Sequence, residues 1–223
     1  MMELCLPMLK YNHKKGAQII KTMKVAVLAS GRGSNFQSII DASKRGELPN
    51  ANVKLLIVNK KKAYAIERAK KHNIPYYFVE SKNRKRNQFD SEMLNILKKN
   101  KIDIIVLAGF MRILSPIFIS EYKNRIINIH PSLLPLFPGA HAHRDVIEAG
   151  ATESGCTVHF VDEGVDTGPI ILQQSLAISS LETEETLAKK ILPLEHKIFP
   201  KALNLLSSQK LEVNEGKVTI HAD

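Results

Sequence analysis

The sequence predicts a single-domain, doubly wound α/β fold with a mostly parallel sheet. From Lys24 onward, short runs of β-branched apolar residues alternate with amphipathic stretches of about ten to fifteen residues, which is typical of βαβ units. The run 104–107 is apolar at every position and indicates a central strand covered on both faces. The chain has 223 residues, a length that fits one domain able to bury a core without disulfides or metals.

Strands are expected where β-branched and aromatic residues cluster, at 25–29, 53–58, 76–79, 104–108 and 126–129. The amphipathic stretches between them predict helices at 35–44, 63–71, 88–99 and 117–122. A segment rich in proline, glycine and histidine after Pro131 predicts a mobile loop, followed by two further strands at 156–161 and 170–178. A final helix is expected at 184–206, kinked or split by Pro193 and Pro200.

The first 22 residues have neither a small-residue cleavage site nor the long apolar core of an export signal. The pattern of a buried strand begins abruptly at Met23, so we interpret 1–22 as an N-terminal extension, either not native or disordered, and 23–223 as the folded domain. Cys5 and Cys156 provide no disulfide framework, and no apolar run approaches the ~18 residues that span a bilayer. These features predict a cytoplasmic protein without membrane association.

The charge balance is strongly basic, with 32 Lys and Arg against 22 Asp and Glu and a net charge of +10. Most of the excess is scattered lysine, and the densest clusters lack interleaved aromatic residues. This pattern favours a solvated surface over a nucleic-acid interface. It is also compatible with small anionic substrates.

The stretch Ser30-Gly31-Arg32-Gly33-Ser34-Asn35 lies between the first predicted strand and the first predicted helix. Glycines let the backbone approach a ligand, and free N–H groups at a helix N-terminus bind anions, so this stretch predicts a phosphate site. A dinucleotide fingerprint would need a third glycine where Phe36 stands, which argues against NAD. The alternative is an ordinary turn in which Ser34 or Asn35 caps the helix.

Asn128 and His130 end the fifth predicted strand, at the sheet edge where open α/β folds bind ligands. Residues two apart on a strand share a face, so the amide and imidazole project together while Ile127 and Ile129 enter the core. Such a pair can stabilise an oxyanion and move a proton. The alternative is a polar strand end that hydrogen-bonds the next loop.

The turn 162–169 groups acidic residues with two glycines and a proline. One of its carboxylates is a candidate partner for His130, which it would orient and whose pKa it would raise. The alternative is a surface loop in which an Asp caps its own backbone.

Three nearby histidines, His130, His141 and His143, raise the question of zinc. No acidic residue is placed as in a His-Glu-x-x-His helix, and neither cysteine is spaced for a metal motif. The sequence therefore favours a site without metal. A serine hydrolase is disfavoured as well, because no Gly-x-Ser-x-Gly elbow is present.

Taken together, four ordered motifs resemble the phosphoribosylglycinamide formyltransferases, a family of folate-dependent enzymes with a Rossmann-like fold. The motifs are Gly31-Arg32-Gly33-Ser34-Asn35, Leu107-Ala108-Gly109-Phe110-Met111-Arg112-Ile113-Leu114, Asn128-Ile129-His130-Pro131-Ser132-Leu133-Leu134-Pro135 and Asp166-Thr167-Gly168-Pro169. The resemblance runs from about Lys24 to the last predicted helix. It implies transfer of a formyl group from 10-formyltetrahydrofolate to the amine of glycinamide ribonucleotide in purine biosynthesis, without a metal.

The resemblance also implies roles for individual residues. The catalytic set would be Asn128, His130 and Asp166. The ribonucleotide, including its phosphate, would be bound by Gly33, Ser34, Asn35 and Glu195. Folate would contact Met111, Arg112, Ile113, Leu114, Asn128, Asp162, Val165 and Asp166, with Arg86 near its glutamate tail. His141 would have a secondary role.

The sequence departs from the family pattern in two places. Leu136 and Gly139-Ala140-His141 stand where many members have a basic residue and Gly-Leu-His. Leu192-Pro193-Leu194 replaces a more polar approach to Glu195. The ligand contacts expected from these two segments are therefore less firmly implied than the catalytic set.

Rival functions differ in what they require beyond the shared motifs. Methionyl-tRNA formyltransferase carries an additional carboxyl-terminal RNA-binding domain, for which this chain is expected to end too soon. Formyltetrahydrofolate deformylase shares Asn, His and Asp but usually has an amino-terminal regulatory domain, and it is the nearest enzyme alternative. A non-catalytic nucleotide-binding protein would not need the catalytic set. We expect a monomer or homodimer.

Overall fold

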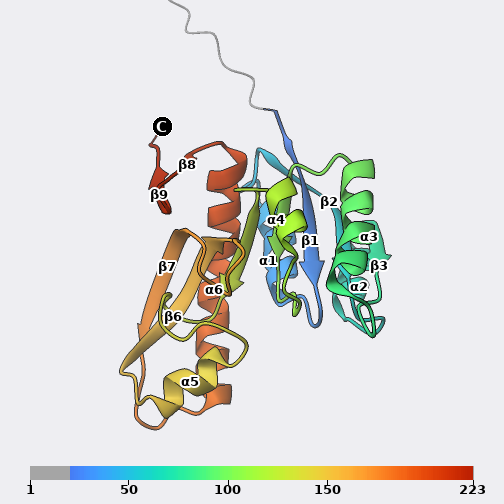
Figure 1. Cartoon of the computed structure of the whole chain (residues 1–223). Helices are drawn as coiled ribbons and strands as arrows, with labels where there is room; N and C mark the ends of the chain where they lie inside the picture. The colour runs from blue at the N-terminus through green and yellow to red at the C-terminus, as the bar shows by residue number, and fades with distance from the viewer. Residues whose placement is uncertain (1–20, 223) are drawn as a thin grey trace, which may run out of the picture.

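The computed structural model describes residues 21–222 and contains a seven-stranded sheet in the order β3-β2-β1-β4-β5-β6-β7 (Figure 1). Five strands run parallel: β1 (Met23–Ala29), β2 (Ala51–Val58), β3 (Tyr76–Phe78), β4 (Ile104–Leu107) and β5 (Ile126–His130). Strand β6 (Glu153–Phe160) runs antiparallel to both of its neighbours, β5 and β7 (Ile170–Ala177). The predicted doubly wound, mostly parallel fold is confirmed.

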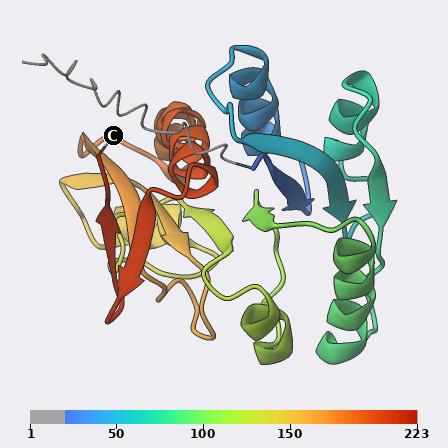
Figure 2. The same ribbon diagram turned by 90° about the horizontal axis from the view of Figure 1, so that it is seen from above.

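Helices cover both faces of the sheet (Figure 2). On one face lie α1 (Ser34–Lys44), α2 (Ala65–Lys71), α5 (Ala142–Glu148) and α6 (Glu184–Ser207), and on the other lie α3 (Arg86–Lys99) and α4 (Pro116–Glu121). In β4, Ile104 and Val106 join the first core and Ile105 and Leu107 join the second, as the uniformly apolar run predicted.

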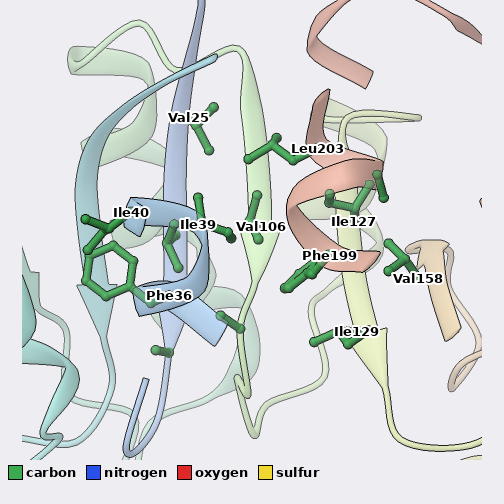
Figure 3. Close-up of a cluster of buried hydrophobic side chains, with 14 of the residues drawn as sticks. Val25, Phe36, Ile39, Ile40, Val106, Ile127, Ile129, Val158, Phe199 and Leu203 are labelled. Atoms are coloured by element: carbon green, nitrogen blue, oxygen red, sulfur yellow. The ribbon is translucent and has the colours of Figure 1, made fainter. Parts of the chain in front are cut away.

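The larger core lies between the sheet and helices α1 and α6 (Figure 3). Phe36 and Ile39 of α1 and Phe199 and Leu203 of α6 are fully buried there, and the two α6 residues lie on the side of Ile127 of β5. Burying side chains of this size stabilises the fold by roughly 1.5–3 kcal/mol each. This packing fixes the positions of α1 and α6. Both helices contribute residues to the candidate site, α1 from its N-terminal turn and α6 from its middle.

Helix α6 corrects one sequence prediction. It is a single helix of 24 residues that contains both Pro193 and Pro200, so the prediction of a split is wrong. A capping box between Thr183 and Thr186 defines its start. The buried stripe on either side of the prolines, from Leu187 to Leu203, keeps the helix packed on the sheet in spite of the lost backbone hydrogen bonds.

The sequence prediction missed two elements. Helix α5 begins within the segment expected to be a loop, and it buries only Ala142 and Val146, too few positions to produce a helical pattern. Strands β8 (Leu211–Asn214) and β9 (Lys217–Ile220) form a separate hairpin. Its turn residues, Glu215 and Gly216, both have positive φ, the geometry of a two-residue hairpin turn.

The predicted extension 1–22 lies almost wholly outside the described residues, and β1 begins at Met23, where the strand pattern begins. None of the helices between residues 21 and 222 has the length and apolar character needed to cross a bilayer.

Candidate active site

The loops that follow β1 and β4 are joined and enclose a cavity. The Ser30 N–H donates to the carbonyl of Gly109 at 3.1 Å, and the Ser30 hydroxyl accepts from the N–H of Met111 at 2.8 Å. The cavity has a volume of about 290 Å³ and is lined by Ser30, Gly31, Arg32, Gly33, Ser34, Asn35, Lys60, Ala108, Gly109 and Met111. It lies at the carboxyl ends of parallel strands, as expected of a ligand site in this fold.

One wall of this cavity is the glycine turn, which we define as residues 31–35. Gly33 has φ +67°, and a Cβ atom there would lie 2.7 Å from the Cβ of Ala65, so the position requires glycine. Among residues 21–222, the N–H groups of Gly33, Ser34 and Asn35 have no acceptor, and no side chain caps α1. The capping alternative is therefore wrong, and the turn offers several free donors to an anion.

The glycine turn is linked to α6 by a buried hydrogen bond. Asn35 Nδ2 donates to Glu195 Oε2 at 2.7 Å, and both residues are more than nine-tenths buried. Burial raises the pKa of Glu195, although the Asn35 amide opposes this shift. Cys156 lies nearby, and burial together with Glu195 raises the pKa of its thiol to about 12, so it remains a neutral thiol.

A second group of polar residues, the Asp166 cluster, consists of Asn128, His130, His159 and Asp166. Asp166 Oδ2 lies 3.2 Å from His130 Nδ1 and accepts from the Gly139 N–H at 2.8 Å. Asp166 Oδ1 lies 3.4 Å from Asn128 Nδ2. The structure thus brings together the three residues of the predicted catalytic set.

The cluster adjoins the cavity through strand register. Leu107 of β4 pairs with Asn128 of β5, and the residues directly after Leu107, Ala108 and Gly109, line the cavity. The glycine turn and the Asp166 cluster therefore lie at the same edge of the sheet, as the positions of both after strand ends had predicted.

His130 is almost fully buried, and burial lowers its pKa in spite of two acceptors beside it. The Phe137 carbonyl, 2.8 Å from Nε2, and the Asp166 carboxylate both act to raise the pKa but do not outweigh burial. The sequence analysis expected a carboxylate to raise the pKa of His130. Asp166 does act in that direction, but the net shift is downward, so the expectation of a raised pKa is wrong. A neutral ring has one N–H for two acceptors, so one of these two contacts has no proton.

Asp166 itself is ionised. Burial alone would raise its pKa, but contacts from His159 and Gly139, together with the nearby His130, lower the pKa below its usual range. Asp166 also has φ +56°, an uncommon conformation for a residue other than glycine.

His159 is the member of the cluster that the sequence analysis missed. It lies on β6 directly opposite Asn128 of β5, and its Nδ1 lies 2.8 Å from the Phe160 carbonyl. The proton is therefore assigned to Nδ1, which leaves Nε2 to accept from Asn128 Nδ2 at 3.2 Å. The signal available in the sequence was a polar residue inside the apolar run 156–161, although only the antiparallel register shows its partner.

Lys60 is a second residue that the sequence analysis did not assign to the site. It follows β2 and lines the cavity beside the glycine turn, where its ammonium group adds positive charge. The sequence analysis treated it as part of a solvated lysine cluster. Its position after a strand end was the available signal.

The turn 162–169 shows both arrangements that its sequence left open, a carboxylate beside His130 and an Asp that caps its own loop. Asp166 contacts His130, whereas Asp162 accepts from the Gly164 N–H at 3.2 Å and the Thr167 hydroxyl at 2.7 Å and so caps its own loop. Val165 is about half exposed at the tip of this loop.

The segment after β4, predicted to contact folate, has mixed exposure. Met111 and Ile113 are exposed, which is unusual for apolar side chains and leaves them open to a ligand. Arg112 lies over the ring of Phe89, 5.7 Å from its centroid. Leu114 is buried in the core.

Two arginines near the start of α3 differ in their partners. Arg84 donates to Glu92 at 2.7 Å, whereas Arg86 is exposed and has no partner within the described part of the chain. Arg86 is therefore the freer of the two to bind an anion. It makes no contact with the Asp166 cluster.

The histidines considered for zinc do not form a ligand set. His141 is exposed at the start of α5, while His143 is partly buried and burial lowers its pKa. No group of three or more His, Cys, Asp or Glu side chains with metal-binding geometry occurs in residues 21–222.

Comparison with known proteins extends these observations. The family model described as formyl transferase matches residues 23–203. Phosphoribosylglycinamide formyltransferase of Escherichia coli (strain K12) is 39% identical over 195 residues, which cover 87% of this chain and 92% of that protein. The crystal structure of glycinamide ribonucleotide transformylase 1 from Symbiobacterium toebii has a TM-score of 0.87 and 37% identity, covering 91% of this chain and 95% of that one.

A longer relative shares the same region. The trifunctional purine biosynthetic protein adenosine-3 of Drosophila pseudoobscura pseudoobscura is 50% identical over 197 residues. The match covers 87% of this chain but only 14% of that protein.

Proposed function

The chain belongs to the formyl transferase family, and from this premise we propose that it transfers the formyl group of 10-formyltetrahydrofolate to the amine of glycinamide ribonucleotide in purine biosynthesis. The observation that carries the proposal is the contact of His130 with Asp166, 3.2 Å apart, beside Asn128 and next to a turn with free N–H groups. The turn fits a phosphate, and the cluster fits acyl transfer.

In this proposal the ribonucleotide phosphate binds the N–H groups of Gly33, Ser34 and Asn35, with Lys60 as a nearby counter-charge. Glu195 lies behind Asn35 and faces the ribose or glycinamide part. A phosphate at a helix N-terminus is stabilised by the free N–H groups and by the helix dipole.

Folate is proposed to lie against the exposed side chains of Met111 and Ile113, with Arg112, Leu114 and the loop of Asp162 and Val165 around it. Arg86 supplies a free guanidinium for the carboxylates of the glutamate tail. His141, exposed at the start of α5, is proposed to have a secondary role.

The proposed reaction is direct attack of the substrate amine on the formyl carbon. A carbon–nitrogen bond forms, the formyl oxygen becomes an oxyanion, and the bond to N10 of the folate then breaks as a water carries a proton from the attacking amine to N10. Asn128 and His130 donate hydrogen bonds to the oxyanion. No metal takes part in this mechanism.

The donors must first release the partners that they contact within the protein. His130 Nε2 exchanges the Phe137 carbonyl for the oxyanion, and Asn128 exchanges its longer contact, 3.4 Å to Asp166. The negative charge that develops on the oxyanion adds to that of Asp166 and favours the protonated form of His130.

The test is formyl transfer from 10-formyl-5,8-dideazafolate, followed by absorbance, with and without glycinamide ribonucleotide and in the presence of a chelator. We expect turnover that requires the ribonucleotide and survives chelation. Formate release without the ribonucleotide would instead identify a deformylase. Ligand binding without turnover in either arm would indicate a binding protein.

The cytoplasmic location, the monomer or homodimer and the boundary at residue 23 stay predictions.

A further inference from the structure

The first turn of α2 holds the glycine turn from behind. The N–H of Ala65 donates to the carbonyl of Gly31 at 3.1 Å, and Nε of Arg68 donates to the carbonyl of Arg32 at 2.9 Å. Two successive carbonyls of the turn therefore point at α2.

The direction of these carbonyls fixes the direction of the following N–H groups. A peptide unit is planar and trans, so the carbonyl of one residue and the N–H of the next point in opposite directions. With the Arg32 carbonyl bound to Arg68, the Gly33 N–H must point away from α2. Because Gly33 has φ +67°, a region that glycine enters freely, its own backbone does little to fix this orientation.

Arg68 is itself fixed by several contacts. Its NH1 donates to Gln37 Oε1 at 3.1 Å, and Gln37 Nε2 donates to Asp41 at 2.9 Å. Its guanidinium also lies over the ring of Tyr64, 5.2 Å from the centroid. A side chain held on three sides can impose a direction on the backbone that it contacts.

A cavity borders the Arg68 side chain, so there is space for the backbone of the turn to move if Arg68 is replaced. A cavity of about 280 Å³ lies between α1, α2 and α6, bordered by Ser34, Gln37, Arg68 and His196. His196 Nε2 is buried and has no hydrogen-bond partner among the described residues. Loss of the Arg68 guanidinium, which borders this cavity, leaves the Arg32 carbonyl without its Nε–H donor.

We propose that Arg68 is a positioning residue that aims the amides of the glycine turn at the phosphate and thereby selects a phosphorylated acceptor. This inference rests on the proposed function, because it assigns the ribonucleotide phosphate to the turn. Arg68 acts through the Arg32 carbonyl and does not touch the substrate.

The test compares Arg68→Met, Arg68→Lys and the control Lys70→Met. Lys70 carries the same charge on the same helix but pairs with Glu67 on the surface. For Arg68→Met we expect the KM for the ribonucleotide to rise about tenfold, the effect of losing a charge-assisted hydrogen bond. The KM for the formyl-folate donor, kcat and the weak reaction of the unphosphorylated glycinamide riboside stay within about twofold of wild type.

Arg68→Lys separates geometry from charge. Lysine keeps the charge but lacks the Nε–H and the planar fork, so the ribonucleotide KM is expected to stay raised. Full restoration by lysine, or an equal rise in Lys70→Met, would show that charge alone matters and would overturn the proposal. So would an equal loss for the riboside and the ribonucleotide in a variant with unchanged melting temperature.

A second measurement separates this proposal from the proposed function. The ¹⁵N amide resonance of Gly33 is followed while inorganic phosphate is added to the wild type and to Arg68→Lys. A shift that saturates in the wild type and needs about tenfold more phosphate in the variant supports positioning, even if the wild type transfers no formyl group. Equal phosphate dependence in the two proteins refutes it.

Discussion

The glycine turn and the Asp166 cluster differ in how their hydrogen-bond donors are used. Among the described residues, the turn presents N–H groups without an acceptor, whereas the donors of the cluster already contact acceptors: His130 contacts Phe137 and Asp166, and Asn128 contacts His159. The turn can therefore accept an anion without rearrangement. The cluster must exchange partners before it can stabilise a substrate oxygen.

This difference separates binding from chemistry. A preformed anion site binds substrate tightly at little cost in ordering, while donors that are released only by substrate contribute mainly in the transition state. Variants of the turn should therefore change KM, and variants of the cluster should change kcat.

The largest effect is expected from removing a donor of the cluster. His130→Ala and Asn128→Ala should each lower kcat about 10²- to 10³-fold, because each removes one hydrogen bond to the developing oxyanion. Steady-state kinetics with both substrates would measure the loss, and thermal unfolding would check the fold. His221→Ala, an exposed histidine paired with Glu212 in the β8–β9 hairpin, is the control. Near-normal kcat in His130→Ala would refute the assignment.

The two regions also differ in how far the sequence predicts them. The glycine turn is contiguous, so its residues and its place between a strand and a helix predict an anion site directly. The seven strands of the main sheet, most helices and the two-sided burial of β4 follow equally from local patterns. All of these depend on residues close together in the chain.

The Asp166 cluster depends on residues far apart in the chain. Strand periodicity placed Asn128 and His130 together, but the partner of Asn128 on β6 follows only from the antiparallel register. The net pKa of His130 depends on burial by several elements, which no local pattern gives. The continuous α6 likewise reflects tertiary packing that overrides the local effect of Pro193 and Pro200.

The next largest effect tests the turn. Gly33→Ala should destabilise the protein by about 1–3 kcal/mol, because alanine must adopt a left-handed conformation and its Cβ meets Ala65. The KM for the ribonucleotide should rise as well. Urea unfolding and steady-state kinetics would measure the two effects.

Gly31→Ala is the matched control for this substitution. A Cβ at Gly31 meets no atom of residues 21–222 within 4 Å, so the free energy of unfolding should change by no more than about 0.5 kcal/mol. Equal destabilisation by the two substitutions would contradict the structural argument.

A smaller effect should follow from loosening the cluster at His159. His159→Phe removes the acceptor for Asn128 Nδ2, so the amide loses one hydrogen bond and kcat should fall about tenfold. His159→Gln keeps an acceptor and should retain more activity. Equal kcat values for the two variants would show that His159 does not orient Asn128.

The smallest effect is expected in the pH dependence of stability, where the two regions act in opposite directions. Burial lowers the pKa of His130 in the cluster, so the unfolded chain binds more protons and the free energy of unfolding falls as the pH drops below about 6.5. Burial raises the pKa of Glu195 behind the turn, so its contribution is present at low pH and is lost as the pH rises through the folded-state pKa. Glu195→Gln removes this opposing contribution, and its stability should therefore fall more steeply than that of the wild type as the pH drops through the raised folded-state pKa of Glu195, measured by urea titrations. His130→Asn should flatten the same curve. A Glu195→Gln curve parallel to the wild type would show that the carboxyl behind the turn does not titrate abnormally.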